Sequence, residues 1–161
     1  MLFYHAILLA ASMMLLPCGY AAELKAYPNV EYVEHSANDG DSFMVKIDGK
    51  THMLRLYYVD CPETTVGSKS DRARVREQAR YFGIASAAPV IAYGKKASEF
   101  TQNMLSDQPF TVHTAFARAL GRSKKPRTYA MVELANGKDF AEVLIHKGLA
   151  RSHGVKRARP D

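Results

Sequence analysis

The chain has 161 residues, and its 22 Lys and Arg residues against 16 Asp and Glu give a formal net charge of +6. This length is enough for one compact domain and excludes two, while the excess positive charge favours a polyanionic partner such as nucleic acid. Basic residues also serve solubility, so the charge alone does not assign the protein to the nucleic-acid-binding class.

The N-terminus has the features of a secretory signal peptide. The first 22 residues contain no Asp, Glu, Lys or Arg, and residues 6–16 are almost wholly apolar. That run is too short to span a membrane but fits a signal-peptide core, and Gly19 and Ala21 place a cleavage site after Ala21 or the following alanine. We therefore predict a signal peptide over residues 1–21, export to the periplasm or the medium, and a mature domain over 22–161 without a membrane span.

The mature domain keeps one cysteine, Cys61, so no disulfide within the chain is predicted. The histidines do not show the paired spacing of zinc ligands, which argues against a zinc site. The histidines considered were His35, His52, His113, His146 and His153.

The predicted elements begin with a short strand at Tyr32 and Val33, followed by a β-hairpin. In its first strand Phe43, Val45 and Ile47 alternate with polar residues, the pair Asp48-Gly49 supplies a tight turn, and residues 53–59 form a second extended run.

A long segment over residues 63–93 follows the hairpin, and part of it is predicted to be helical. Ser70 or Asp71 would cap this helix, and Val75, Ala79 and Phe82 would share a face. Two interpretations carry equal weight: a basic flap that touches phosphates beside a site, and a solvated surface helix. The basic residues in question are Arg72, Arg74, Arg76 and Arg80.

The second half of the chain predicts a helix over Lys95–Leu105, strands over 110–116 and 128–134, and a helix over Phe140–Lys147 that ends at Gly148. Three strands, a helix, two strands and a helix form the pattern of an OB-type barrel. The predicted fold is thus α+β, mainly β, with a five-stranded OB-fold barrel and two to three helices. A fold does not fix a function, so function has to be argued from the site.

Carboxylates flank the predicted hairpin. Asp41 opens its first strand and Asp60 closes its second, so both would lie at the same end of a sheet. Two close carboxylates repel each other unless a cation lies between them, and a hard ion such as Ca²⁺ accepts carboxylate and carbonyl oxygens. Glu63 follows the rigid turn at Pro62 and would face the same ion as a base acting on water.

Arg55 lies within an otherwise apolar strand, where a charge is costly without a partner. We expect it to pair with a carboxylate at rest and to bind a phosphate when substrate arrives. Asp39-Gly40-Asp41 alone is typical of a turn, and residues 60–63 alone could simply end a strand. Their joint presence around one hairpin favours an active site.

These motifs resemble the staphylococcal nuclease (thermonuclease) family over about residues 30 to 151. The resemblance is carried by Asp39-Gly-Asp-Ser, by Arg55 to Glu63, by Tyr93 to Thr101, by Tyr129 to Val132 and by Gly148-Leu149-Ala150. It implies Ca²⁺-dependent endonucleolytic cleavage of DNA and RNA on an OB-fold, with nucleic acid as the partner, no stable protein partner and a monomeric state.

The resemblance also implies roles for single residues. The metal ligands fall on the carboxylates of Asp41 and Asp60 and on the backbone carbonyl of Cys61, and Asp39 matches a nearby carboxylate. The general base falls on Glu63, and the phosphate-stabilising arginines fall on Arg55 and Arg127. We choose Arg127 over Arg122 because it adjoins the last predicted strand of the barrel and would be held rigidly there.

Three departures from the family stand out. Cys61 replaces a threonine, which a ligand acting through its backbone oxygen tolerates. Lys125 and Gly154 lie where the family has tyrosines that flank the nucleotide. The chain ends at Asp161, before the family's C-terminal helix.

Two alternatives remain open from the sequence. One is a catalytically inactive barrel of the same family that binds nucleic acid, and the other is a structural or partner-binding envelope protein. The joint retention of the acidic residues and arginines argues against both.

Overall fold

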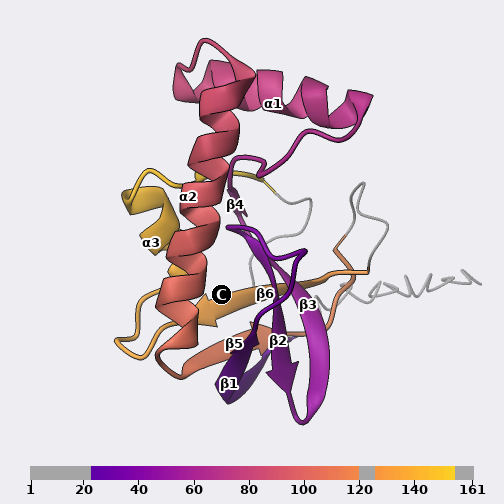
Figure 1. The fold of residues 1–161 in the computed structure, drawn as a ribbon. Helices are drawn as coiled ribbons and strands as arrows, with labels where there is room; N and C mark the ends of the chain where they lie inside the picture. Colours follow the sequence, from indigo (N-terminus) through magenta and orange to yellow (C-terminus); the bar gives the residue numbers. More distant parts are fainter. Residues whose placement is uncertain (1–22, 120–125, 155–161) are drawn as a thin grey trace, which may run out of the picture.

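The computed structural model describes residues 23–119 and 126–154; the predicted signal peptide lies outside them. Within these residues, strands β1, β2, β3, β6 and β5 close into a barrel in that order, and β4 pairs with β7 in a separate two-stranded sheet. Helices α1, α2 and α3 lie outside the barrel (Figure 1). The predicted five-stranded OB-type barrel with two to three helices is confirmed. The element bounds are β1 Lys25–Val33, β2 Ser42–Ile47, β3 Lys50–Leu56, β4 Val59–Asp60, α1 Lys69–Phe82, α2 Ala87–Ser106, β5 Phe110–Thr114, β6 Thr128–Glu133, α3 Phe140–His146 and β7 Arg151–Ser152.

The predicted hairpin is formed by β2 and β3. Asp48 and Gly49 have φ angles of 49° and 77°, the backbone of a two-residue turn that Asp-Gly favours. The alternation in β2 turns Phe43, Val45 and Ile47 into the barrel, where each is buried. The hairpin therefore supplies one wall of the core, and its outward-facing residues are available to a site.

The extended run predicted over residues 53–59 is wrong at its end. β3 stops at Leu56, and the chain turns at Tyr57 and Tyr58, where Tyr58 has a φ of 63°. The next two residues form β4, which pairs with β7 instead of with the barrel. Asp60 therefore reaches the hairpin by a turn and does not lie on it. A positive φ at a non-glycine residue is uncommon, so the alternating pattern gave no sign of this break.

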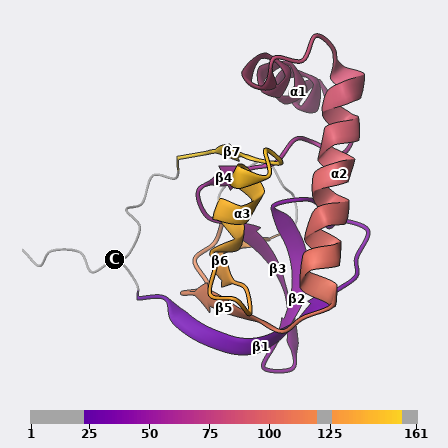
Figure 2. The same ribbon diagram turned by 90° about the vertical axis from the view of Figure 1, so that its left-hand side faces the viewer.

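Helix α2 begins at Ala87, eight residues before the predicted start at Lys95. Pro89 lies in the first turn, where the missing N–H is tolerated, and a buried stripe runs along the whole helix. The stripe consists of Val90, Gly94, Ala97, Thr101 and Leu105. Its C-terminal part packs against the barrel through Ala97 and Leu105, whereas the N-terminal part extends past the barrel to α1 (Figure 2).

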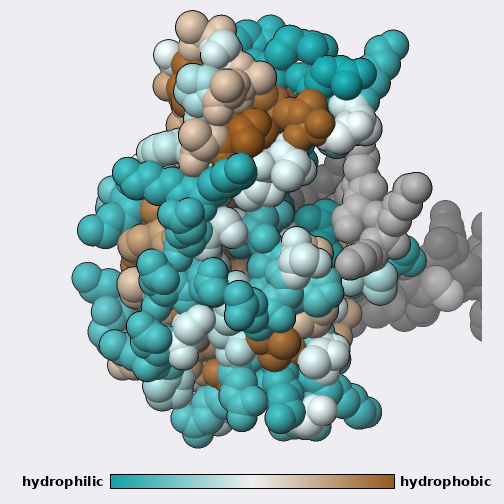
Figure 3. Space-filling view, viewed as in Figure 1, coloured by the Kyte–Doolittle hydropathy of each residue, from teal (hydrophilic) through white to brown (hydrophobic). Residues whose placement is uncertain are grey.

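Helix α1 fills the part of the segment predicted to be helical. Its N-cap is Ser68, two residues before the nearer predicted cap, and Asp71 completes a capping box by accepting the Ser68 backbone N–H. Val75 and Ala79 pack against Val90 of α2 in a small second core. On the face shown in Figure 3, hydrophobic side chains gather beneath α1, whereas hydrophilic residues cover most of the barrel below.

The third helix follows the prediction closely. It spans Phe140–His146, with Asp139 as N-cap and Lys147 as C-cap, and Gly148 ends it with a φ of 68°. Phe140 and Leu144 are fully buried against the barrel. No helix among residues 23–119 and 126–154 is long and apolar enough to cross a membrane.

Candidate active site

Helix α2 holds the turn that carries Asp41. The Thr101 hydroxyl donates a 2.8 Å hydrogen bond to the Gly40 carbonyl oxygen, and Thr101 is fully buried. A Cβ at Gly40 would lie 2.7 Å from the Cys61 Sγ and 2.9 Å from the Ala97 Cβ. Glycine is therefore required where this turn meets both α2 and the second acidic turn.

The same helix holds the turn that carries Glu63. A Cβ at Gly94 would lie 2.3 Å from the Glu63 carbonyl oxygen and 2.5 Å from that of Pro62. The backbone of this turn thus rests directly on the helix, at a place where no side chain fits. Because Gly94 and Thr101 are seven residues apart, two turns of one helix fix the spacing between the two acidic turns.

The two aspartates predicted as metal ligands lie close together. Asp41 is 2 % exposed and Asp60 is 0 % exposed, and the guanidinium of Arg55 bridges them. Arg55 Nη1 pairs with Asp41 Oδ1, and its Nη2 lies 3.2 Å from Asp60 Oδ1. The Cys61 backbone N–H also donates to Asp41 Oδ2 over 2.6 Å. The structure therefore places Asp41, Asp60, Cys61 and Arg55 together, as the sequence predicts.

Asp60 is the most heavily engaged acid of the cluster. Its Oδ1 accepts from Arg55 and Arg74, and its Oδ2 accepts from Gln78 Nε2 at 3.2 Å and from Arg151 Nε at 2.9 Å. Burial by itself would raise the pKa of Asp60, but the guanidinium of Arg74, followed by that of Arg55, outweighs it and lowers the pKa. Asp60 is therefore held as a carboxylate by charges from three separate elements.

Glu63 is connected to the cluster through Arg74, which also pairs with Asp60. Its Oε1 is 2.5 Å from Arg74 Nε, although the geometry is poorly aligned for a hydrogen bond. Burial raises the pKa of Glu63 against the opposing charge of Arg74. A carboxylate with a raised pKa is better suited to accept a proton, which agrees with the predicted role as a base.

Arg127, directly before β6, contacts the first residue of β2 beside the cluster. Its Nη1 donates a 3.1 Å hydrogen bond to the Ser42 hydroxyl, which in turn lies 3.1 Å from Asp41 Oδ1. Burial and the nearby charge of Arg55 lower the pKa of Arg127. The Nε of Arg127 is buried and has no hydrogen-bond partner among the described residues. Arg122, the alternative arginine, lies outside the described residues.

Asp39 supports the turn through its side chain. Its Oδ1 accepts the backbone N–H groups of Asp41 at 3.1 Å and Ser42 at 2.7 Å. Burial, together with the neighbouring Asp41 carboxylate, raises the pKa of Asp39.

Helix α1 brings two residues into the site: Gln78, to which the sequence analysis gave no role, and Arg74, which it considered only as part of a basic flap. Gln78 is fully buried, and its Nε2 donates to Asp60 Oδ2 and, over 3.0 Å, to the Cys61 carbonyl oxygen. Its Oε1 accepts the Glu63 backbone N–H at 3.0 Å. The second residue is Arg74, which points into the acid cluster, whereas the other three arginines of the helix are exposed.

The donor atoms fit a hard cation in kind, because Asp41 and Asp60 offer carboxylate oxygens and Cys61 offers a carbonyl. Burial raises the pKa of the Cys61 thiol well above its usual range, which leaves the carbonyl as the suitable donor of that residue. In this arrangement guanidinium and amide groups hold those oxygens, and no cluster of three or more acids, His or Cys among the described residues is arranged to hold an ion. A cation at Asp60 would therefore have to displace one of its donors.

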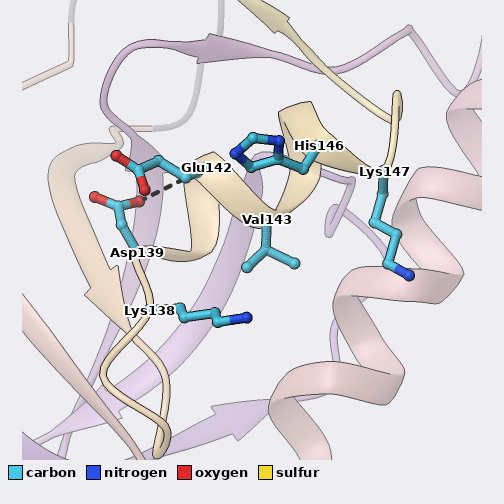
Figure 4. Close-up of a pocket in the computed structure, with 6 residues that line it drawn as sticks. All are labelled: Lys138, Asp139, Glu142, Val143, His146 and Lys147. Atoms are coloured by element: carbon cyan, nitrogen blue, oxygen red, sulfur yellow. Dashed lines mark hydrogen bonds between the residues drawn. The ribbon is translucent and has the colours of Figure 1, made fainter.

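A separate pocket lies on the outside of α3 (Figure 4). It contains none of the predicted site residues, and Lys138 and Lys147 extend on the side nearer α2 while Asp139 and Glu142 lie on the other. Its mixed charges and exposed lining give it no resemblance to a catalytic cleft.

Comparisons with known proteins identify related sequences. The sequence model of a family described as Staphylococcal nuclease homologue matches residues 53–161. The chain is 34% identical over 115 residues to the Thermonuclease of Staphylococcus hyicus, covering 71% of the chain and 54% of that relative. It is 31% identical over 121 residues to the Thermonuclease of Staphylococcus intermedius, covering 75% of the chain and 58% of that relative. The chain thus spans little more than half the length of the relatives it matches.

Proposed function

Because the chain belongs to the staphylococcal nuclease family, we propose that it is a Ca²⁺-dependent endonuclease that hydrolyses phosphodiester bonds in DNA and RNA. The observation that carries this proposal is the meeting of three acids with arginines in one place. The acids are Asp41, Asp60 and Glu63, and the arginines proposed to bind the phosphate are Arg55 and Arg127. A module that only binds nucleic acid needs basic groups but has no use for such a buried set of acids.

The chemical demand of the reaction explains this composition. A phosphodiester is already anionic, and the attack of water adds charge to the phosphoryl oxygens in the transition state. When bound by Asp41, Asp60 and the Cys61 carbonyl, Ca²⁺ would supply positive charge to one of these oxygens.

The arginines would bind the remaining oxygens. Arg55 and Arg127 are planar donors that can hold a phosphate through two parallel hydrogen bonds. Arg127 makes one hydrogen bond through Nη1, to the Ser42 hydroxyl, and we expect its guanidinium to turn to the phosphate when substrate arrives. Arg55 is paired with Asp41 and Asp60 at rest, and we expect one of its nitrogens to turn to the phosphate when substrate arrives.

Glu63 would orient the attacking water and take its proton on a carboxylate oxygen as the new P–O bond forms. Its raised pKa supports this role, and its backbone is held in place by Gln78 and Gly94. The bond from phosphorus to the leaving oxygen then breaks, and that oxygen is protonated from solvent.

The setting of the enzyme follows from the same reasoning. We propose an exported monomer whose partners are its nucleic acid substrates, with the net charge of +6 assisting their capture. Binding should weaken steeply with salt, since phosphate contacts release counterions.

A digestion assay tests the function. Mature protein is incubated with plasmid DNA and with RNA in Ca²⁺, and in parallel with excess chelator. Cleavage only with Ca²⁺ supports the proposal. A gel shift without cleavage would show the inactive nucleic-acid-binding alternative, and neither cleavage nor binding would favour the envelope-protein alternative.

A further inference from the structure

Helix α1 is held against the acid cluster by direct hydrogen bonds. Gln78 is fully buried and makes three hydrogen bonds to Asp60, Cys61 and Glu63. The helix also has a capping box at Ser68 and buries Val75 against α2. Its position relative to the acids is therefore imposed by packing and buried polar contacts.

Arg74 lies one helical turn before Gln78, so both side chains leave the same face of α1. Its Nη2 pairs with Asp60 Oδ1, and its Nε lies 2.5 Å from Glu63 Oε1. The side chain is 29% exposed, against 11% for Arg55. Arg74 thus bridges a proposed metal ligand and the proposed base from the solvent side.

Arg74 is one of several guanidinium groups that offset the acids of the cluster. Asp60 alone pairs with three of them, those of Arg55, Arg74 and Arg151. Sites for hard divalent cations gain affinity with the net negative charge of their ligands. Removal of Arg74 would make the charge of the cluster more negative by one unit and so favour a divalent cation.

We propose that Arg74 is a built-in counter-ion that competes with the divalent cation for Asp60 and Glu63, and so sets the cation concentration at which the site is occupied. This inference rests on the proposed function, because it concerns the cation of that same site. Of the donors to Asp60, Arg74 is the one that can leave. Arg55 is nearly buried between two aspartates, Gln78 is fully buried, and Arg151 is 9% exposed and also pairs with Glu77 at 2.9 Å.

The test measures cation binding instead of activity. Calcium chloride is titrated calorimetrically into the mature full chain and into Arg74→Met, which keeps an unbranched apolar stem and removes the charge. Arg76→Met is the matched control, since Arg76 is exposed on the same helix and its loss changes the net charge equally. Arg74→Gln serves as a second variant, and circular dichroism verifies that each protein is folded.

We expect the Kd of Arg74→Met for Ca²⁺ to be at least about tenfold lower than that of wild type, because a nearby positive charge that repels the ion is removed. Arg76→Met should stay near wild type. The Ca²⁺-induced rise in melting temperature should be larger in Arg74→Met and Arg74→Gln, since a ligand stabilises the folded state according to its affinity.

Equal or weaker Ca²⁺ binding in both Arg74 variants, including no binding by any protein, would overturn the inference. A gain of the same size in Arg76→Met would also overturn it, because the effect would then be one of net charge. The proposed function fails by a different result: wild-type protein that cleaves no nucleic acid at any Ca²⁺ concentration, whatever the binding isotherms show.

Discussion

Replacing Gly94 by alanine tests how α2 positions the base. In an unobstructed helix interior this substitution stabilises a protein by about 1 kcal/mol, because alanine loses less backbone entropy. At Gly94 the new Cβ would lie 2.3 Å from the Glu63 carbonyl oxygen and 2.5 Å from that of Pro62. Backbone atoms cannot rotate aside, so the turn has to move by roughly 1 Å to restore an ordinary contact.

The size of the effect follows from these distances. Overpacking costs about 1–3 kcal/mol, and contacts this short with backbone place Gly94→Ala near the upper end. After the gain in helix propensity, we expect the free energy of unfolding to fall by about 2 kcal/mol. A shift of 1 Å in a reacting group lowers kcat by roughly 100-fold, and the moving turn carries Glu63.

Urea unfolding and the initial rate of cleavage of a fluorescent oligonucleotide measure the two effects. Ala92→Gly is the control, because Ala92 is exposed on the same helix. It should lose about 1 kcal/mol through helix propensity alone and keep its kcat. A Gly94→Ala protein as stable as wild type, or one that is destabilised but retains full kcat, would refute this account of the helix contact.

Further substitutions probe the remaining parts of the site. Gln78→Met should lower the free energy of unfolding, measured in urea, by about 3 kcal/mol, since three buried hydrogen bonds are lost. The matched control Gln102→Met, at a half-buried position on α2, should change it by less than about 0.5 kcal/mol. Equal losses in the two variants would contradict a special role for Gln78. Glu63→Gln should lower kcat by about 100-fold or more while a gel shift with DNA persists; unchanged kcat would remove Glu63 as the base. Arg127→Lys should lower kcat by about 100-fold, because lysine cannot bind a phosphate through two parallel hydrogen bonds as a planar guanidinium does. Arg122→Lys should leave kcat unchanged. The reverse pattern would transfer the role to Arg122.

Local sequence signals predicted much of the fold. The hairpin follows from Asp48-Gly49 and the alternation around it, because turn and strands are close in sequence and each supports the other. The start of α2 could not be found in this way, since Pro89 and Gly94 both disfavour a helix. Packing of Val90 and the backbone of residues 62–63 against α2 outweighs that preference.

The candidate site was also predictable only in part from the sequence. The juxtaposition of Asp41 and Asp60 was predictable because few residues separate each from the hairpin, although the turn at Tyr58 that delivers Asp60 was not. The roles of Arg74 and Gln78 depend on which face of α1 meets the cluster. Periodicity identifies an apolar face but cannot tell which polar neighbour points inward, since that depends on tertiary packing.

The most direct measurement for the central claim is the initial rate of oligonucleotide cleavage across a Ca²⁺ titration, for wild type and for Asp41→Asn, with folding verified by circular dichroism. The proposed metal site predicts a wild-type rate that rises to saturation with Ca²⁺ and returns to background in excess chelator. It also predicts that Asp41→Asn is slower by about 100-fold or more, because a charged ligand at the reacting centre is lost. A wild-type rate that is undiminished by chelator, or an Asp41→Asn rate equal to wild type, would contradict it.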